Sequence, residues 1–468
     1  MNDRCLAHEN ASDFTPVATV LRSARPIVVR FGTRIGLSLI EILIALTMTL
    51  IVLGAMMTAF QFASEKMQAG RAMMELANRA RTAESLLRSD LANLTLEPRP
   101  YSQTTIPPGY FEYVEGPYRD GIDPILNTSG RPKDNYLGDI DDILAMTVRS
   151  SGRAFKGRYN NGIIESPIAE VVWFTTVNDL DTGAVVEFDE SLGFADSVRI
   201  HRRALLIRPD LTGSGLPTGQ LLDDVNNVTA VAFMQANDIS VRITPGTAVN
   251  TFDVFANGLT DLGERKNRFC HRYADSIATH QFPNILRREW LITRMTPDDI
   301  LLTDVAGFNV QVYSPNSAVN NIADMIIEPG DPGFVSTGST PALGGFVDLG
   351  FNAAASGSGW FHEFPNAKSN CQYSLPTPAT ATLFDCVYDT WTPVYESDGV
   401  DQDGDSLVDE GTDGIDNDNA NGVDDNRERE TLPPYPHPIR GLKVSIRLIE
   451  KGSKQVHQTS VIQSFVPE

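Results

Sequence analysis

The chain of 468 residues has few cysteines and a deficit of basic residues. Four cysteines are too few for a disulfide framework of the kind that holds small secreted domains together. Lysine and arginine number 38 against 60 aspartates and glutamates, which gives a formal net charge of −22. Such a charge repels phosphate backbones and anionic membrane surfaces, so we expect no nucleic acid among the partners of this protein.

The sequence also lacks the motifs that usually carry catalysis. Its seven histidines form no HExxH or other metal-ligand spacing, and there is no G-x-S-x-G and no phosphate-binding loop. The stretch SGSG, with Gly357 and Gly359, lies in a segment rich in serine and alanine, which favours a connector over a phosphate cradle. We therefore expect that this protein is not an enzyme.

The few cysteines leave two alternatives open. Cys371 and Cys386 are close enough in sequence to form a disulfide if their domain lies in an oxidising compartment, and Cys270 would then stay free. Cys5 lies near the N-terminus, before the apolar segment. Unpaired structural cysteines are the alternative.

Proline is absent from residues 37–97, so nothing there stops a helix before Pro98. The first part, 37–60, is an apolar run in which Glu41 is the only charged residue. About 20 apolar residues in a helix span a hydrocarbon core. A carboxylate inside such a span costs about 2.5–3.5 kcal/mol, so it needs a partner or a role.

Basic residues precede this run. Arg22, Arg25, Arg30 and Arg34 all lie on its N-terminal side, where Asp13 is the last acid. The positive-inside rule then keeps the N-terminus in the cytoplasm and sends the rest of the chain across the membrane. A secretory signal peptide, the alternative, predicts a shorter apolar region followed by a small-residue cleavage site.

The second part of the proline-free stretch has a different pattern. Its apolar residues recur at steps of three and four, which marks one face of a helix. A helix over 37–97 would be about 90 Å long, with a membrane-length first half and a second half that lays its apolar stripe on a soluble domain. The stripe consists of Met73, Leu76, Ala80, Ala83, Leu87, Leu91 and Leu94.

Residues 36–41 read GLSLIE at the start of this helix. A glycine, a small hydroxyl residue and a glutamate at these places before a proline-free apolar helix resemble the prepilin-type cleavage and methylation motif of type IV pilins and type II secretion pseudopilins. The resemblance implies that a prepilin peptidase cuts between Gly36 and Leu37 and methylates the new amine. Glu41 becomes the fifth mature residue, although Leu37 stands where the family usually has phenylalanine.

The freed amine gives Glu41 a partner. A carboxylate in the first turn also meets the positive end of the helix dipole. When such helices bundle, an amine–carboxylate pair between subunits would offset the cost of burying both charges and set the axial register. Glu41 is therefore the predicted assembly residue.

After Pro100 the pattern predicts strands. Apolar runs pair across a loop with Asp179, Asp181 and Gly183 within residues 169–188, and further strands are expected over 142–150, 203–211, 301–314 and 441–466. In the last, Leu442, Val444, Ile446 and Leu448 alternate with polar residues. A long helix followed by antiparallel strands predicts an α+β fold.

Several pieces of this region, in order, resemble the J-type minor pseudopilin of type II secretion. They are LLRSDLANL at the end of the helix, HRRALLIRP, GFNVQVY, YDTWTPVY and the proline-led final hairpin YPHPIRGLKVSIRLIE. The resemblance implies a pilin-like fold with a long N-terminal helix and an antiparallel β-rich head that carries long insertions.

We expect five segments. They are a cleaved cytoplasmic leader (1–36), a transmembrane and stalk helix (37–97), a β-rich periplasmic head (98–393), an acidic insert (394–430) and the final β-hairpin of the head (431–468). The insert holds fourteen acids and two arginines, so it carries −12 of the net charge.

The acidic insert repeats with a period of 15 residues, and it resembles the aspartate-rich calcium repeats of extracellular bacterial proteins. Acids at positions 1, 3, 5 and 9 place oxygens on one side of a tight turn, which suits Ca²⁺. It is not an EF-hand, because position 12 never carries the bidentate glutamate; a solvated acidic loop is the alternative. The candidate ligands are Asp401, Asp403, Asp405, Leu407 (through its carbonyl) and Asp409 in the first copy, and Asp416, Asp418 and Asp424 in the second.

Taken together, these patterns predict a minor pseudopilin of a type II secretion system in the inner membrane, with a single span, a cytoplasmic N-terminus and its head in the periplasm. Its expected partners are the prepilin peptidase, the other minor pseudopilins and the major pseudopilin of the filament. The alternatives are a minor pilin of a type IV pilus and a membrane-anchored calcium-binding surface protein.

Overall fold

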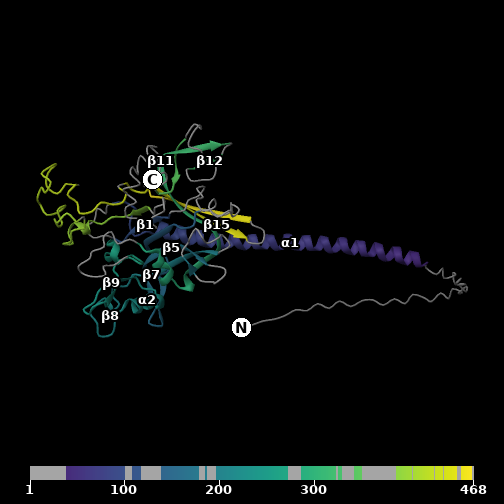
Figure 1. Ribbon diagram of the computed structural model, residues 1–468, viewed down its shortest axis with the longest axis horizontal. Coiled ribbons are helices and arrows are strands. Elements are labelled where there is room, and N and C mark those ends of the chain that lie inside the picture. The colour runs from purple at the N-terminus through teal and green to yellow at the C-terminus, as the bar shows by residue number, and fades with distance from the viewer. Residues whose placement is uncertain are drawn as a thin grey trace, which may run out of the picture. The chain divides into compact units, whose positions relative to one another are not determined.

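The computed structural model describes residues 38–100, 108–116, 139–178, 185–186, 197–271, 286–322, 325–328, 342–349, 386–450 (without 403, 426 and 436) and 455–465. The chain divides into two compact units, Met1–Lys66 and Met67–Glu468. Figure 1 shows one long helix and a β-rich domain, which fits an α+β layout.

The helices are α1 (Leu39–Ala92), α2 (Asn227–Ala236) and α3 (Arg288–Arg294), with short 3₁₀ turns at 261–263, 265–267, 297–299 and 393–396. The strands follow in chain order: β1 (Phe111–Glu115), β2 (Ile143–Arg149), β3 (Phe155–Tyr159), β4 (Gly162–Ser166), β5 (Ile168–Asn178), β6 (Val185–Val186), β7 (Ser197–Leu206), β8 (Gln220–Val225), β9 (Val241–Pro245), β10 (Phe252–Ala256), β11 (Ile300–Ile322), β12 (Met325–Ile327), β13 (Ala342–Val347), β14 (Cys386–Asp389), β15 (Gly441–Glu450) and β16 (Gln455–Ser464).

The proline-free stretch forms the predicted helix, and the predicted stripe is its buried face. Leu76, Ala80, Ala83, Leu87 and Leu91 are all buried in the domain core. Periodicity alone located this face correctly, because steps of three and four keep side chains on one side of a helix.

The helix ends at Ala92 rather than at residue 97. Beyond it the backbone pairs with the end of β2: Leu94 forms a bridge with Val148, and the Thr95 amide donates to the Thr147 carbonyl at 3.0 Å. A tertiary partner for these backbone groups therefore stops the helix before the first proline does.

The main sheet runs in the order β14-β1-β2-β5-β7-β11-β15-β16, and all of its pairs are antiparallel. The predicted strands overlap β2, β5, β7, β11 and the final hairpin. The strand expected over 203–211 is displaced, because β7 begins at Ser197 and ends at Leu206. The final hairpin pairs Gly441 with Ser464 and Glu450 with Gln455, and β6 pairs with the end of β5. The loop with Asp179, Asp181 and Gly183 lies outside the described residues.

Both faces of strands β1, β2, β5 and β7 are buried, because successive side chains point to opposite faces. Along β5, Val171 and Trp173 belong to the core that contains the α1 stripe. Val172 and Phe174 belong to a second core, which also includes residues of α2, α3 and the small sheet β8-β10-β9. This arrangement explains why β2 and β5 carry apolar residues on both faces. Two buried charged residues of β1 and β7, Glu112 and Arg203, are in ion pairs instead.

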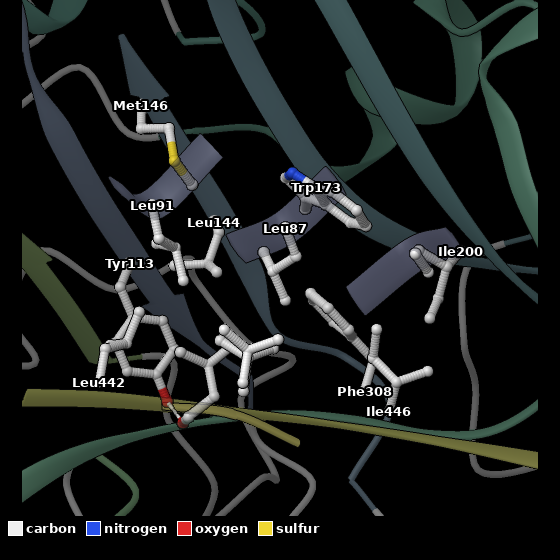
Figure 2. Close-up of a cluster of buried hydrophobic side chains, with 14 of the residues drawn as sticks. Leu87, Leu91, Tyr113, Leu144, Met146, Trp173, Ile200, Phe308, Leu442 and Ile446 are labelled. Carbon is white, nitrogen blue, oxygen red and sulfur yellow. Dashed lines mark hydrogen bonds between the residues drawn. The ribbon is translucent and has the colours of Figure 1, made fainter. Parts of the chain in front are cut away.

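Figure 2 shows how the first core closes. Leu87 and Leu91 of α1 point between Leu144 on β2 and Leu442 on β15, so the helix fills the space between distant parts of one sheet. On β15 the predicted alternation is confirmed, since Leu442, Val444, Ile446 and Leu448 are all buried in this core.

The structure tests part of the prediction about the cysteines. Cys386 is disulfide-bonded, whereas Cys270 is free and buried, as the disulfide alternative predicts. Cys371 and Cys5 lie outside the described residues, and so does the partner of Cys386. Burial raises the pKa of the Cys270 thiol well above its ordinary value, which keeps it protonated and unreactive.

An acid on the buried face of α1 joins the helix to the sheet. Asp90 is 2% exposed; it accepts a hydrogen bond from Trp173 Nε1 and a bidentate pair from Arg202 Nε and Nη2, each at 2.8 Å. Arg202 also lies over the ring of Trp173. Because the stripe was defined by apolar residues alone, the sequence did not identify this carboxylate.

Replacing Asp90 tests this connection. Asp90→Ala leaves the Arg202 guanidinium without its carboxylate, so we expect a loss of about 3–5 kcal/mol in the free energy of unfolding. Arg88→Ala is the control: it removes the exposed pair with Glu84 on the same helix, and its cost should stay near about 0.5 kcal/mol. Urea denaturation of the full chain in detergent measures both, and equal losses would contradict the assignment.

Candidate functional site

The first candidate site is the start of α1. The Ser38 amide donates to Glu41 Oε2 at 2.9 Å, and the Glu41 amide donates to Ser38 Oγ at 3.3 Å. This reciprocal pair is a capping box, which satisfies two amides that a helix start otherwise leaves unpaired. The pattern S-x-x-E would have identified it in the sequence. Gly36 and Leu37 lie outside the described residues.

The residues after Glu41 form an apolar surface. Among the described residues, only the helix Leu39–Ala92 is long and apolar enough to cross a membrane. The most apolar stretch of this helix is not buried in the protein. Leu39, Ile51 and Phe60 are each more than half exposed. A surface of this size and character needs a cover that the described chain does not supply.

The second candidate site is the acidic insert, whose two copies fold alike. Asp398 accepts from the Val400 amide and Asp413 from the Ile415 amide; likewise Asp409 accepts from the Gly399 amide and Asp424 from the Gly414 amide. Positive φ angles also recur at the same spacing of 15 residues, at Gly399 and Gly414, Gly404 and Asn419, Ser406 and Asn421, and Asp409 and Asp424.

Two glutamates after the repeats close the two loops. Glu430 accepts from the amides of Gln402 and Asp409 in the first copy, at 3.0 and 2.6 Å. Glu428 accepts from the amides of Asn417, Asp418 and Asp425 in or beside the second copy. Both glutamates are buried. Sequence reasoning missed them because they lie outside the 15-residue repeat.

Each of the described predicted aspartates accepts an amide hydrogen bond within the insert, and two of them also gather with a third acid. Asp416 and Asp418 come together with Glu428, and ligand oxygens of the three lie within 4.8 Å of one another, so this group can hold a metal ion. Asp401 and Asp405 accept amide hydrogen bonds within their loop, from Gly404 and Leu407 respectively, as Asp409 and Asp424 do in the contacts given above. The side chain of Leu407 is exposed, and Asp403 lies outside the described residues.

Like charges meet in the first copy. Burial, together with the neighbouring carboxylates of Glu430 and Asp405, raises the pKa of Glu410 to about 7. Two carboxylates this close need a shared proton or a cation between them. Every side chain in the cluster offers oxygen, the donor that hard cations such as Ca²⁺ and Mg²⁺ prefer.

The insert is joined to the head by hydrogen bonds at its end. The Glu430 and Thr431 amides donate to the Glu396 carboxylate at 3.0 and 3.3 Å, and Trp391 Nε1 donates to Thr431 Oγ1 at 2.8 Å. Trp391 is 2% exposed. These hydrogen bonds therefore anchor the backbone at Glu430 and Thr431 to the core of the head.

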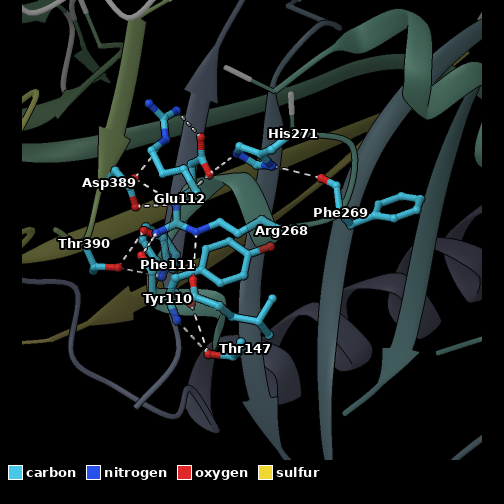
Figure 3. A network of polar contacts seen from close by, with 12 residues as sticks. Tyr110, Phe111, Glu112, Thr147, Arg268, Phe269, His271, Asp389 and Thr390 are labelled. Atoms are coloured by element: carbon cyan, nitrogen blue, oxygen red, sulfur yellow. Dashed lines mark hydrogen bonds and ion pairs between the residues drawn. The ribbon is translucent and has the colours of Figure 1, made fainter. Parts of the chain in front are cut away.

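A buried network of charges lies close to Trp391, whose ring centroid is 6.0 Å from the Arg265 guanidinium carbon. Figure 3 shows the part of this network around Arg268. Arg268 contacts both Glu112 on β1 and Asp389 on β14, at 3.0 and 2.8 Å. His271 places Nε2 2.8 Å from Glu112 and Nδ1 3.0 Å from the Phe269 carbonyl. Burial favours the neutral acid at Glu112, but the charge of His271 and those of the neighbouring arginines hold its pKa well below the ordinary value. This network is part of the fold, since each of these groups has a partner.

Two further acidic groups have the spacing of a metal site. Glu115, Asp139 and Asp142 are fully buried together, and burial, followed by the mutual repulsion of these and nearby carboxylates, raises the pKa of Asp139 well above its usual range. The second group, Asp223, Asp224 and Asp253, lies on the small sheet, where Asp224 accepts hydrogen bonds from Thr247 and Thr251. Neither group was predicted, because the three acids of the first group and Asp253 of the second come together only in the fold.

No protein-family model, no curated protein and no solved structure matches this chain. What its sites can do therefore follows from their own chemistry.

His201 makes the stability of the head depend on pH. The ring is buried on β7, stacked on Phe174 with 4.9 Å between centroids, and its Nε2 lies 2.7 Å from Thr176 Oγ1. Burial lowers its pKa from 6.5 to about 4. The unfolded chain therefore binds a proton at a higher pH than the folded chain does, and stability falls as the pH drops from 6.5 towards 4.

Replacing His201 should weaken the dependence of the unfolding free energy on pH. We expect His201→Gln to reduce the loss of unfolding free energy between pH 6.5 and 4 by about 3 kcal/mol relative to the unmodified chain. His457→Gln on β16 serves as the control and should leave the pH dependence unchanged. Urea denaturation at several pH values between 6.5 and 4 gives the unfolding free energy of each protein. The same pH dependence in all three proteins would contradict the role assigned to His201.

Proposed function

We propose that this chain is a minor pseudopilin of a type II secretion system, most like the J-type subunit, and that its role is assembly rather than catalysis. The observation that carries the proposal is one helix with two surfaces. Residues 39–60 expose an apolar surface of membrane length after Glu41, and residues 76–91 bury an apolar stripe in a β-rich head. The GLSLIE stretch before it supports prepilin-type processing.

In this proposal the capping box sets the starting state of Glu41. Its carboxylate is held by the Ser38 amide until another donor competes for it. Cleavage between Gly36 and Leu37 supplies a free amine, on this chain or on a neighbouring one. A charged amine is a stronger partner than a neutral amide, so packing of helices exchanges a local hydrogen bond for an ion pair between subunits.

The proposed setting is the inner membrane, with the head in the periplasm and the subunit at the tip of a short filament. Its partners there are the prepilin peptidase, the other minor pseudopilins and the major pseudopilin. The disulfide at Cys386 supports an oxidising compartment for the head.

The acidic insert favours a second candidate, a membrane-anchored surface protein that binds calcium. Under either function we propose that Ca²⁺ is the ion that the insert binds. Oxygen is the only donor type in the group Asp416, Asp418 and Glu428, and irregular loops suit the variable coordination of Ca²⁺ better than the strict octahedron of Mg²⁺. A minor pilin of a type IV pilus would carry the same N-terminal features, and the genes beside this one distinguish it from a pseudopilin.

The N-terminus of the mature protein tests the proposal most directly. Mass spectrometry of the protein isolated from membranes of its own host should find a mature chain that begins at a methylated Leu37. A chain that still begins at Met1, or one cut further along, would reject the pseudopilin and leave the surface protein.

Glu41 offers a test that separates charge pairing from helix capping. Glu41→Gln retains a residue that can complete the capping box but removes the charge, whereas Ser38→Ala removes the cap and retains the charge. We expect Glu41→Gln and Glu41→Ala to be processed and inserted but to be absent from filaments.

Ser38→Ala and Glu65→Gln are the controls for this test, and both should enter filaments. Immunoblots of sheared filaments, compared with those of membranes, give the incorporated fraction. Normal incorporation of Glu41→Gln would show that the charge has no role in assembly.

A further inference from the structure

Glu428 and Glu430 each hold one repeat, although only Arg429 lies between them in the chain. We call residues 428–430 the closing strap. Glu430 binds amides of the first copy and Glu428 binds amides of the second. Their neighbour Arg429 separates them, so the two carboxylates lie at alternate positions and serve different loops.

Each repeat also holds one buried carboxylate oxygen that has no hydrogen-bond partner. These atoms are Glu410 Oε2 in the first copy and Asp425 Oδ2 in the second. The two residues stand 15 positions apart, so they are equivalent in the repeat. Glu410 is only 5% exposed. A buried acceptor without a donor is costly, and its recurrence at one repeat position indicates a common missing partner.

The surroundings of these oxygens specify a cation. Asp425 donates its amide to Glu428, whose carboxylate lies within 4.8 Å of Asp416 and Asp418. The Glu410 side chain lies within hydrogen-bonding distance of the Glu430 carboxylate, so two acids face each other here as well. The partner that fits between such groups is positively charged and prefers oxygen.

We infer that the insert binds two divalent cations, one in each repeat, and that the closing strap supplies a ligand to both. Glu410 and Glu430 hold the first ion, together with Asp401, which occupies the repeat position equivalent to Asp416. Asp416, Asp418, Asp425 and Glu428 hold the second. This inference deepens the calcium binding proposed above and is independent of the pseudopilin assignment.

Binding at these sites has a consequence for the head. The strap continues into Thr431, which accepts a hydrogen bond from Trp391, and the Glu430 amide donates to Glu396. Cations that hold Glu428 and Glu430 therefore order the strap against a buried tryptophan. Ion binding should accordingly alter the fluorescence of Trp391 and slow hydrogen exchange at the Gln402 and Asp418 amides.

Stoichiometry is the first test. The full chain in detergent, freed of metal with EDTA and then dialysed, is titrated with CaCl₂ in a calorimeter. We expect two ions per chain, one ion for Glu430→Gln, one for Glu428→Gln and none at the same concentrations for the double variant. Glu165→Gln removes an equal charge from the exposed hairpin β3–β4, where its partner is Lys156, and should still bind two.

Glu410 and Asp425 give a second test, whose expected result differs from that of a variant that simply fails to fold. Glu410→Gln puts an amide donor beside Glu430, so in EDTA the variant should unfold at the same temperature as the unmodified chain or higher. In CaCl₂ it should gain less thermal stability than the unmodified chain. Asp425→Asn should act in the same way on the second site, because its Oδ1 still accepts from the Arg427 amide.

The results that would contradict the cation sites differ from those that would contradict the pseudopilin proposal. Two ions retained by both strap variants, or fewer than two ions bound by the unmodified chain, would overturn the inference. So would a Glu410→Gln variant that is less stable in EDTA yet gains full stability from CaCl₂. The mature N-terminus is measured on a separate sample from the host, so a failed pseudopilin assignment leaves the calorimetric result intact, and the reverse also holds.

Discussion

Packing of one helix stripe into one antiparallel sheet is the contact on which the rest of the head depends. Leu87 and Leu91 lie between β2 and β15, strands far apart in the sequence, and Asp90 beside them binds Arg202 on β7. Removal of this stripe would expose the inner face of the sheet from β1 to β16. The opposite face of β1, β2, β5 and β7 is covered by the second core, so α2, α3 and the small sheet β8-β10-β9 have a structural role there.

Charge in this protein is handled in two different ways. In the head, buried carboxylates such as Glu112 and Asp90 lie against arginines, and their cost is offset by ion pairs with good geometry. In the insert, Glu410 and Glu430 lie against each other. Mutual repulsion of this second kind also occurs in the head, among Glu115, Asp139 and Asp142. In the insert it accompanies the cation binding proposed above.

Both the helix and the strands could be predicted from local patterns, since periodicities of 3.6 and 2 are properties of the sequence itself. The end of α1 could not, because Leu94 and Thr95 leave the helix to pair with β2. The acidic repeat predicted a cation site and two of the acids that the structure groups together, Asp416 and Asp418. It could not indicate Glu428 or Glu430, because these glutamates follow the repeats in sequence and meet the loop amides only once the chain is folded.

By itself, the sequence determined the membrane-length helix, its buried stripe, the strands β2, β5, β11, β15 and β16 and the position of Glu41 in the first turn, since each depends on neighbours within a few residues. Tertiary structure alone decided which strands pair, where Asp90 finds its arginine and which glutamate closes each acidic loop. These contacts join residues separated by tens or hundreds of positions. Only the packed core brings such residues within the few ångströms over which hydrogen bonds and ion pairs act.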